Sequence, residues 1–69
     1  MTGLRERQKA GRRRDILAAA SQLFRKDGFA DTSVEAIAAL AEVGTGTVYN
    51  YFSSKGDLLM ALVALEDRK

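Results

Sequence analysis

The sequence contains no cysteine and no histidine. Disulfide bonds are therefore excluded, and we expect no metal site, since protein zinc sites depend on these two side chains. There is no Ser-His or Cys-His pair for nucleophilic catalysis, no paired-carboxylate cleft, and no Gly-rich phosphate loop followed by Lys-Ser/Thr. We therefore expect neither an enzyme nor a bound cofactor. The lack of cysteine is compatible with a cytoplasmic protein.

Long apolar segments are missing as well. No run approaches the roughly 20 apolar residues that span a bilayer, and none follows the basic amino end as it would in a signal peptide. The 69 residues have room for one small domain with a modest core. The chain also has no proline, no repeats and no strand patterns.

The net charge of +2 conceals an uneven distribution along the chain. Residues 1–14 carry six basic side chains and one acidic side chain, a net charge of +5, whereas residues 15–69 carry five basic and eight acidic ones, a net charge of −3. The charge density and the glycines of residues 1–11 predict a flexible basic arm. Such an arm indicates an anionic partner, either a nucleic acid or a membrane surface, unless it is only a solvated leader.

Apolar spacing predicts two helices in the first part of the domain. Residues 12–26 carry one apolar stripe at helical spacing, and this helix ends at Gly28, which suits a left-handed terminating position. Residues 32–35 match a capping box, with a hydroxyl at Thr32 and a carboxylate at Glu35. A helix of about two turns is expected to follow.

Two further helices are predicted after a brief break at residues 42–44. Residues 45–51 form the third, with Gly44 as its N-cap and with glycine and β-branched residues that make it a poor helix by propensity. Residues 54–57 are a second capping signature that opens a fourth, apolar helix. No helix stop signal follows that helix, which predicts that a further domain is absent from this chain.

Two short helices joined by a tight turn form a helix-turn-helix, whose second helix enters the major groove of DNA. An α-helix with side chains is about 10–12 Å across and fits a groove about 12 Å wide. Position 38 requires a small residue, because the two helices are expected to cross closely there, and Ala38 meets this requirement. The outward face of the third helix is polar, with short groups that can meet base edges and one aromatic side chain; it comprises Thr45, Gly46, Thr47, Tyr49 and Asn50.

These segments resemble the amino-terminal domain of tetracycline-repressor-type (TetR-family) transcriptional regulators. The resemblance rests on the runs Thr32-Ser33-Val34-Glu35-Ala36-Ile37-Ala38, Gly46-Thr47-Val48-Tyr49-Asn50-Tyr51-Phe52-Ser53-Ser54-Lys55 and Leu58-Leu59, with Ile16, Ala20, Phe24, Gly28 and Phe29 upstream. It covers about residues 12–65. It implies an all-α fold, a three-helix bundle with a homeodomain-like helix-turn-helix at about residues 33–52 plus the start of a fourth helix.

The resemblance also implies roles for individual residues. The start of the second helix, Tyr49 and Lys55 are expected to contact phosphate. The start of the third helix is expected to face bases, and Asn50 to lie at the DNA surface. Tyr51 stays ambiguous between core and phosphate contact, and the basic run at residues 12–14 either touches the DNA backbone or minor groove or is solvated. The predicted DNA-binding residues are Arg12, Arg13, Arg14, Thr32, Ser33, Val34, Thr45, Gly46, Thr47, Tyr49, Asn50, Tyr51 and Lys55.

Three positions depart from the family pattern. Glu42 stands where the turn usually has glycine, which costs about 1 kcal/mol if the backbone there is left-handed. Gly44 replaces the usual serine-like cap of the third helix, a loss of a few tenths of a kcal/mol. Gly56 replaces a usual acidic residue at the start of the fourth helix.

The expected function is sequence-specific binding of double-stranded DNA by a bacterial one-component regulator, a repressor released by a small-molecule effector. The resemblance implies a homodimer that reads a palindromic operator, with dimerisation and effector binding in a C-terminal domain outside this chain. A helical protein-protein interaction module is the alternative, supported by the apolar fourth helix. A membrane-surface helix at residues 4–17 is weaker, since it lacks the Trp, Phe and Leu expected on its apolar face.

Overall fold

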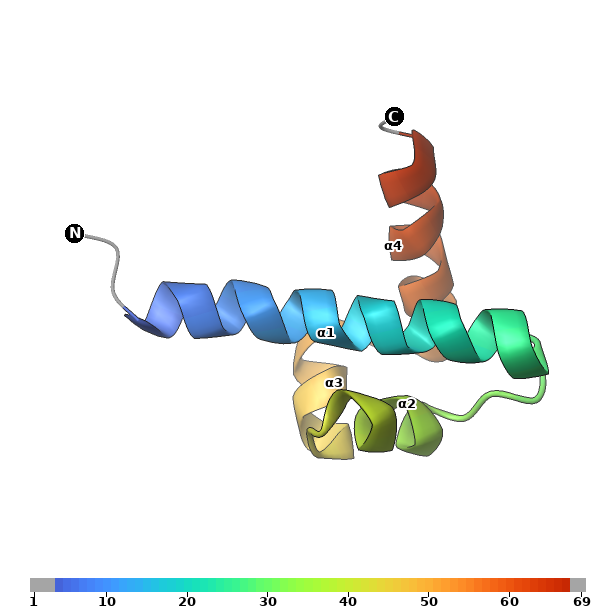
Figure 1. Cartoon of the computed structure of the whole chain (residues 1–69), viewed down its shortest axis with the longest axis horizontal. Coiled ribbons are helices and arrows are strands. Elements are labelled where there is room, and N and C mark those ends of the chain that lie inside the picture. The colour runs from blue at the N-terminus through green and yellow to red at the C-terminus, as the bar shows by residue number, and fades with distance from the viewer. Residues whose placement is uncertain (1–3, 68–69) are drawn as a thin grey trace.

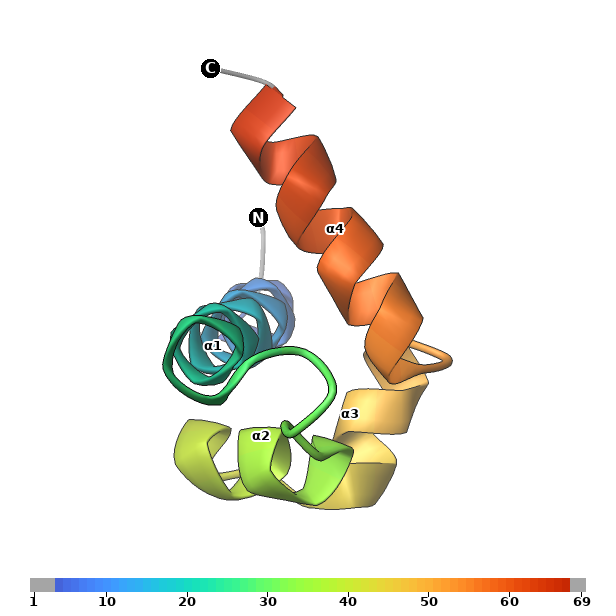
Figure 2. The same cartoon turned by 90° about the vertical axis from the view of Figure 1, so that its right-hand side faces the viewer.

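The computed structural model describes the backbone of residues 4–67, and side chains within residues 11–65. It contains four helices in this part of the chain: α1 (Leu4–Asp27), α2 (Val34–Ala41), α3 (Thr45–Tyr51) and α4 (Lys55–Asp67). Figure 1 shows α2 and α3 on one side of the long helix α1, with α4 rising past its other side, and Figure 2 shows the same arrangement along α1. The predicted all-α helix-turn-helix fold is confirmed.

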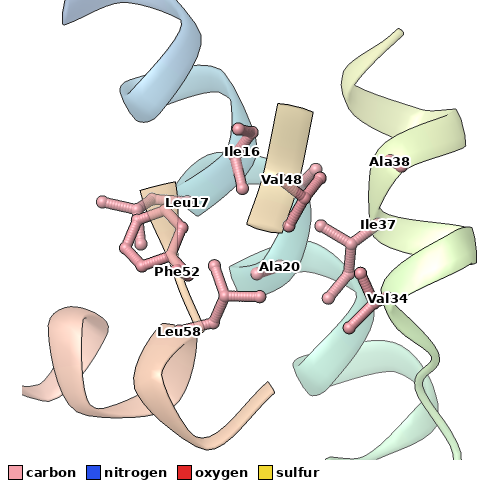
Figure 3. Close-up of a cluster of buried hydrophobic side chains, with 10 residues drawn as sticks. Ile16, Leu17, Ala20, Val34, Ile37, Ala38, Val48, Phe52 and Leu58 are labelled. Carbon is pink, nitrogen blue, oxygen red and sulfur yellow. The ribbon is translucent and has the colours of Figure 1, made fainter. Parts of the chain in front are cut away.

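One core joins all four helices. Each helix supplies one large side chain that is fully buried: Ile16 from α1, Ile37 from α2, Val48 from α3 and Leu58 from α4. Figure 3 shows these side chains meeting between the helices, together with the ring of Phe52. Burying a side chain of this size contributes about 1.5–3 kcal/mol, so this cluster fixes how α2 and α3 sit against α1.

Residues 4–11, predicted as part of a flexible arm, are helical, because α1 begins at Leu4. The prediction gave Gly11 too much weight as a helix breaker. A glycine inside a helix costs only about 1 kcal/mol relative to alanine, and residues 5–10 are Arg, Glu, Gln, Lys and Ala, which favour helix. The part of the predicted arm at residues 1–3 lies outside the described residues.

The N-cap of α2 is Ser33, one residue after the Thr32 of the predicted capping box. The Ser33 hydroxyl oxygen accepts a hydrogen bond from the backbone N–H of Ala36 at 3.0 Å. Thr32 is only 3% exposed, and its hydroxyl donates to the carbonyl oxygens of Gly28 at 2.7 Å and Leu23 at 3.1 Å. Thr32 therefore satisfies carbonyls at the end of α1 and fastens the α1–α2 loop.

The other helix ends agree with the sequence. Gly28 has a φ of +87°, as predicted for a left-handed terminating residue. The Ser54 hydroxyl oxygen accepts from the N–H of Asp57 at 3.2 Å, and the Asp57 carboxylate accepts from the N–H of Ser53 at 3.1 Å. These two bonds join residues 53–57 at the start of α4 and confirm the second capping signature.

The turn between α2 and α3 contains a strained residue. Glu42 has φ 60° and ψ 42°, the left-handed conformation that glycine adopts most readily. Its backbone N–H donates to the carbonyl oxygen of Ala39, and the N–H of Val43 donates to that of Ala38 at 2.9 Å. These bonds end α2 and aim the chain into α3, whose N-cap is Gly44 as predicted.

We predict that Glu42→Gly raises the free energy of unfolding. A left-handed non-glycine residue costs about 1–2 kcal/mol, and the extra flexibility of glycine in the unfolded chain returns about 0.5–1 kcal/mol. The net gain is about 0.5–1 kcal/mol, measurable by urea denaturation. Glu42→Ala is the control, because it removes the carboxylate and keeps a Cβ at this φ. An equal gain in both variants would assign the effect to charge and not to backbone strain.

Candidate nucleic-acid interface

Helix α3 presents two different faces. Val48 is 1% exposed and points into the core, and Phe52 just beyond the helix end is also buried. On the opposite side, Gly46, Asn50 and Tyr49 are exposed, Tyr49 to 51%. The exposure predicted for this face is confirmed for these three residues, whereas Thr45 and Thr47 are half-buried.

Packing holds α3 in place despite its poor helix propensity. The N–H of Phe52 donates to the carbonyl oxygen of Val48 at 2.9 Å and ends the helix in an extended residue. Tyr51 is half-buried and packs against the core, with its ring centroid 6.5 Å from that of Phe52. This placement favours the core role among the two roles predicted for Tyr51. The polar face therefore stands on a rigid support.

A shallow depression lies beside this face and brings together three of the predicted phosphate ligands. Ser33 from the start of α2, Tyr49 from α3 and Lys55 from the start of α4 line it, along with Ser54. The amino ends of two helices thus open onto one hollow. Unpaired N–H groups and the positive end of the helix dipole make such places favourable for anions.

Lys55 is held in a defined position at this depression. Its ammonium group donates a hydrogen bond to the carbonyl oxygen of Phe29 at 2.7 Å and lies 4.3 Å from the centroid of the Phe29 ring. An ammonium group has three N–H donors, so this bond leaves further donor capacity. The lysine is thus fixed in orientation and still able to bind an anion.

Acidic side chains set a limit on anion binding here. Glu35 lines the same depression from the first turn of α2, where a carboxylate stabilises the helix dipole. Glu42 is exposed in the turn before α3. Both carboxylates repel phosphate and so oppose the favourable groups beside them.

Several predicted ligands do not present their side chains at this surface. Thr32 and Val34 border the depression. The side chains of Thr32 and Val34 are buried, so only their backbone remains for a contact with DNA, and a side-chain contact from either is not supported. Arg13 lies with its guanidinium 5.3 Å from the ring centroid of Phe52, and with Arg14 it lines a groove between α1 and α4. Arg12 is exposed one helical turn before the buried Ile16. The three arginines therefore do not form one surface.

Sequence reasoning missed the role of Phe29. In the sequence it stood out only as part of the family resemblance, and in the structure its ring lies 5.2 Å from that of Phe24. The same residue also holds Lys55, which is 26 positions away in the chain. No periodicity or capping pattern pairs residues at that separation, so only the folded structure reveals the contact.

Among the described residues, no group of three His, Cys, Asp or Glu side chains lies close enough together to hold a metal ion. No helix in residues 4–67 has the length and apolar character required to cross a membrane.

Comparison with known proteins agrees with this geometry. The family model described as bacterial regulatory proteins, tetR family, matches residues 16–62. The chain is 44% identical over 48 residues to the HTH-type transcriptional regulator HbdR of Aromatoleum sp. (strain CIB), which covers 70% of this chain and 21% of HbdR.

Two relatives are named as repressors. The chain is 37% identical over 62 residues to the HTH-type transcriptional repressor NicS of Pseudomonas putida (90% of this chain, 29% of NicS). It is 42% identical over 55 residues to the HTH-type transcriptional repressor KstR of Rhodococcus jostii (80% of this chain, 26% of KstR).

The chain spans between 21% and 29% of the lengths of these three relatives. No solved structure shows a significant match to it. The family match covers most of the chain and includes the helix-turn-helix, the exposed face of α3 and the lysine at the start of α4. The chain therefore belongs to the tetR family of bacterial regulatory proteins and carries the DNA-binding domain of a transcriptional regulator.

Proposed function

We propose that this domain binds double-stranded DNA with sequence specificity by placing α3 in the major groove. The observation that carries the proposal is the two-faced character of α3, buried at Val48 and open to solvent at Gly46, Tyr49 and Asn50. A helix of this width fits the major groove, where each base pair presents its own pattern of donors and acceptors.

The residues divide into those that read bases and those that position the domain. Asn50 and the hydroxyls of Thr45 and Thr47 meet base edges, and Gly46 lets the backbone approach the DNA closely. Their closeness along one helix restricts them to a few adjacent base pairs. In the depression beside them, the phosphate ligands are Ser33, Tyr49 and Lys55.

The whole protein acts, in this proposal, as a homodimeric repressor. NicS and KstR are named as repressors, and proteins of their length have room for a second domain beyond the portion that this chain spans. That domain dimerises, so that two heads read a palindromic operator and block polymerase in the cytoplasm. A small-molecule effector bound outside residues 1–69 changes the spacing of the heads and releases the DNA.

Selection of bound duplexes from a random pool tests the specificity. The chain, immobilised and washed at increasing salt, is expected to enrich one short half-site motif, because a single α3 reads only a few base pairs. A dimeric protein is expected to enrich the same motif as an inverted repeat. Recovery of duplexes with no shared motif would contradict base reading by α3.

We predict that Lys55→Met weakens binding to all duplexes alike. Affinity for DNA falls with salt, and loss of one phosphate contact makes the slope of log affinity against log salt concentration less steep by about 0.9. It also costs roughly five-fold in affinity at about 0.15 M salt. Fluorescence anisotropy at several salt concentrations measures both quantities. Arg25→Met is the matched control. It also replaces one positive charge with methionine, but Arg25 lines the groove between α1 and α4, away from the proposed DNA-binding surface. An unchanged slope for Lys55→Met would contradict the phosphate role.

A further inference from the structure

Phe29 connects the core of the domain to the proposed phosphate-binding surface. The residue is 39% exposed, and its ring packs at a tilt of 49° on the ring of Phe24, which itself packs against the buried core. The other side of the residue faces α4, where the Lys55 ammonium lies over the ring and bonds to the Phe29 carbonyl oxygen. One residue therefore contacts Lys55 through both its side chain and its backbone.

The Phe29 carbonyl is itself fixed. It also accepts a hydrogen bond from the N–H of Thr32 at 3.3 Å, which closes a turn in the α1–α2 loop. The left-handed Gly28 precedes this turn, and the buried Thr32 hydroxyl ties it to the carbonyl oxygens of Gly28 and Leu23. The acceptor for the Lys55 ammonium is thus as rigid as the end of α1.

We propose that Phe29 is a positioning residue for DNA binding, which holds the Lys55 ammonium at the rim of the depression before DNA arrives. The inference rests on the proposed function, in which Lys55 binds a phosphate. It extends that function by assigning a role to a residue that does not itself touch DNA.

The physical reason is preorganisation. Lysine has a long flexible side chain, and ordering it when DNA binds costs affinity. A cation held over an aromatic face and bonded to a carbonyl has already lost that freedom on folding. Ordering one long side chain in advance is worth roughly two- to five-fold in affinity, and this gain disappears when the aromatic face is removed.

A purely structural role for the Phe29 ring makes a different prediction. If the ring matters only through its packing on Phe24, its removal disturbs the DNA-binding surface independently of Lys55. The loss of affinity then persists whether or not Lys55 carries a charge. A double-mutant cycle separates the two roles, because interaction between two residues appears as non-additivity.

The test compares Phe29→Leu in the parent and in the Lys55→Met background, with the selected duplex as the probe. Leucine keeps apolar packing on Phe24 and removes the aromatic face. Thermal unfolding checks that each variant is folded, and Phe29→Tyr restores the ring if the loss comes from the missing aromatic face. Met60→Ala serves as the control for loss of an exposed apolar side chain on the same domain.

The expected result is a roughly two- to five-fold loss from Phe29→Leu in the parent background and no further loss in Lys55→Met. Phe29→Tyr is expected to bind as the parent does. In the free protein, the proton signals of the Lys55 ε-methylene group are expected to be shifted upfield by the Phe29 ring and to return to ordinary values in Phe29→Leu.

Equal losses from Phe29→Leu in both backgrounds would overturn the inference, as would the absence of any loss in the parent. If Lys55→Met lowers affinity and salt slope while Phe29→Leu does nothing, only the positioning role fails. If Lys55→Met itself changes neither quantity, the proposed phosphate contact fails, and the role of Phe29 in DNA binding fails with it.

Discussion

Gly46→Leu is expected to make the domain more stable and to weaken its binding to DNA by roughly ten- to hundredfold. These opposite effects arise from one position. A Cβ built on Gly46 meets no atom within 4 Å, so the folded protein has space for a side chain there. Leucine also favours helix over glycine, which adds about 0.5–1 kcal/mol to the free energy of unfolding.

The loss of binding has a steric cause. Gly46 is exposed in the first turn of α3, where the backbone is proposed to approach the DNA. A leucine side chain there occupies the space of a base edge or a sugar, and overpacking of a close interface costs about 1–3 kcal/mol. Thermal unfolding and fluorescence anisotropy with the selected duplex measure the two effects.

Gly11→Leu is the matched control for Gly46→Leu. Gly11 lies inside α1, and a Cβ built on it also meets nothing within 4 Å. This variant is expected to stabilise the domain by a similar amount and to bind DNA as the parent does. If Gly46→Leu also binds with parental affinity, the start of α3 does not approach DNA, and the proposed docking is wrong.

Ile37→Ala is expected to leave much of the protein unfolded at room temperature. Ile37 is fully buried between α1, α2 and α3, and removal of such a side chain costs about 2–5 kcal/mol. A domain of this size without disulfides or metal holds only about 3–5 kcal/mol in total. The expected readouts are a strongly reduced helical circular dichroism signal and loss of DNA binding.

Leu40→Ala provides the comparison within the same helix. Leu40 is 47% exposed, so its truncation removes little buried contact and is expected to change the free energy of unfolding by less than about 0.5 kcal/mol. Should Ile37→Ala unfold with a midpoint close to that of Leu40→Ala, the core shown in Figure 3 does not hold the helices together.

Most of the helix boundaries could be predicted from the sequence, because local signals in the chain determine them. The apolar stripes, the second capping signature and the turn residues predicted α3 as residues 45–51, the extent of α2 and the start of α4. Glu42 stands at the turn position where glycine was expected, and its backbone is left-handed, with a φ of 60°. In each of these cases the decisive contacts lie within a few residues of one another.

The failures have a different origin. Thr32 and Ser33 both carry a hydroxyl that can cap a helix, and the carbonyls near the end of α1 decide that Thr32 turns inward. The arginines at residues 12–14 look alike as a basic run, yet the position of α4 gives Arg13 and Arg14 a different environment from Arg12. Tertiary contacts select among local alternatives that the sequence leaves equal.

Amide chemical-shift mapping with the selected duplex tests most directly whether α3 is the surface that meets DNA. The largest changes are expected at residues 45–50, with further changes at Ser33 and Lys55 and little change at Leu62 and Leu65 in the groove between α1 and α4. A titration in which residues 45–50 keep their free positions while that groove shifts would contradict the central claim.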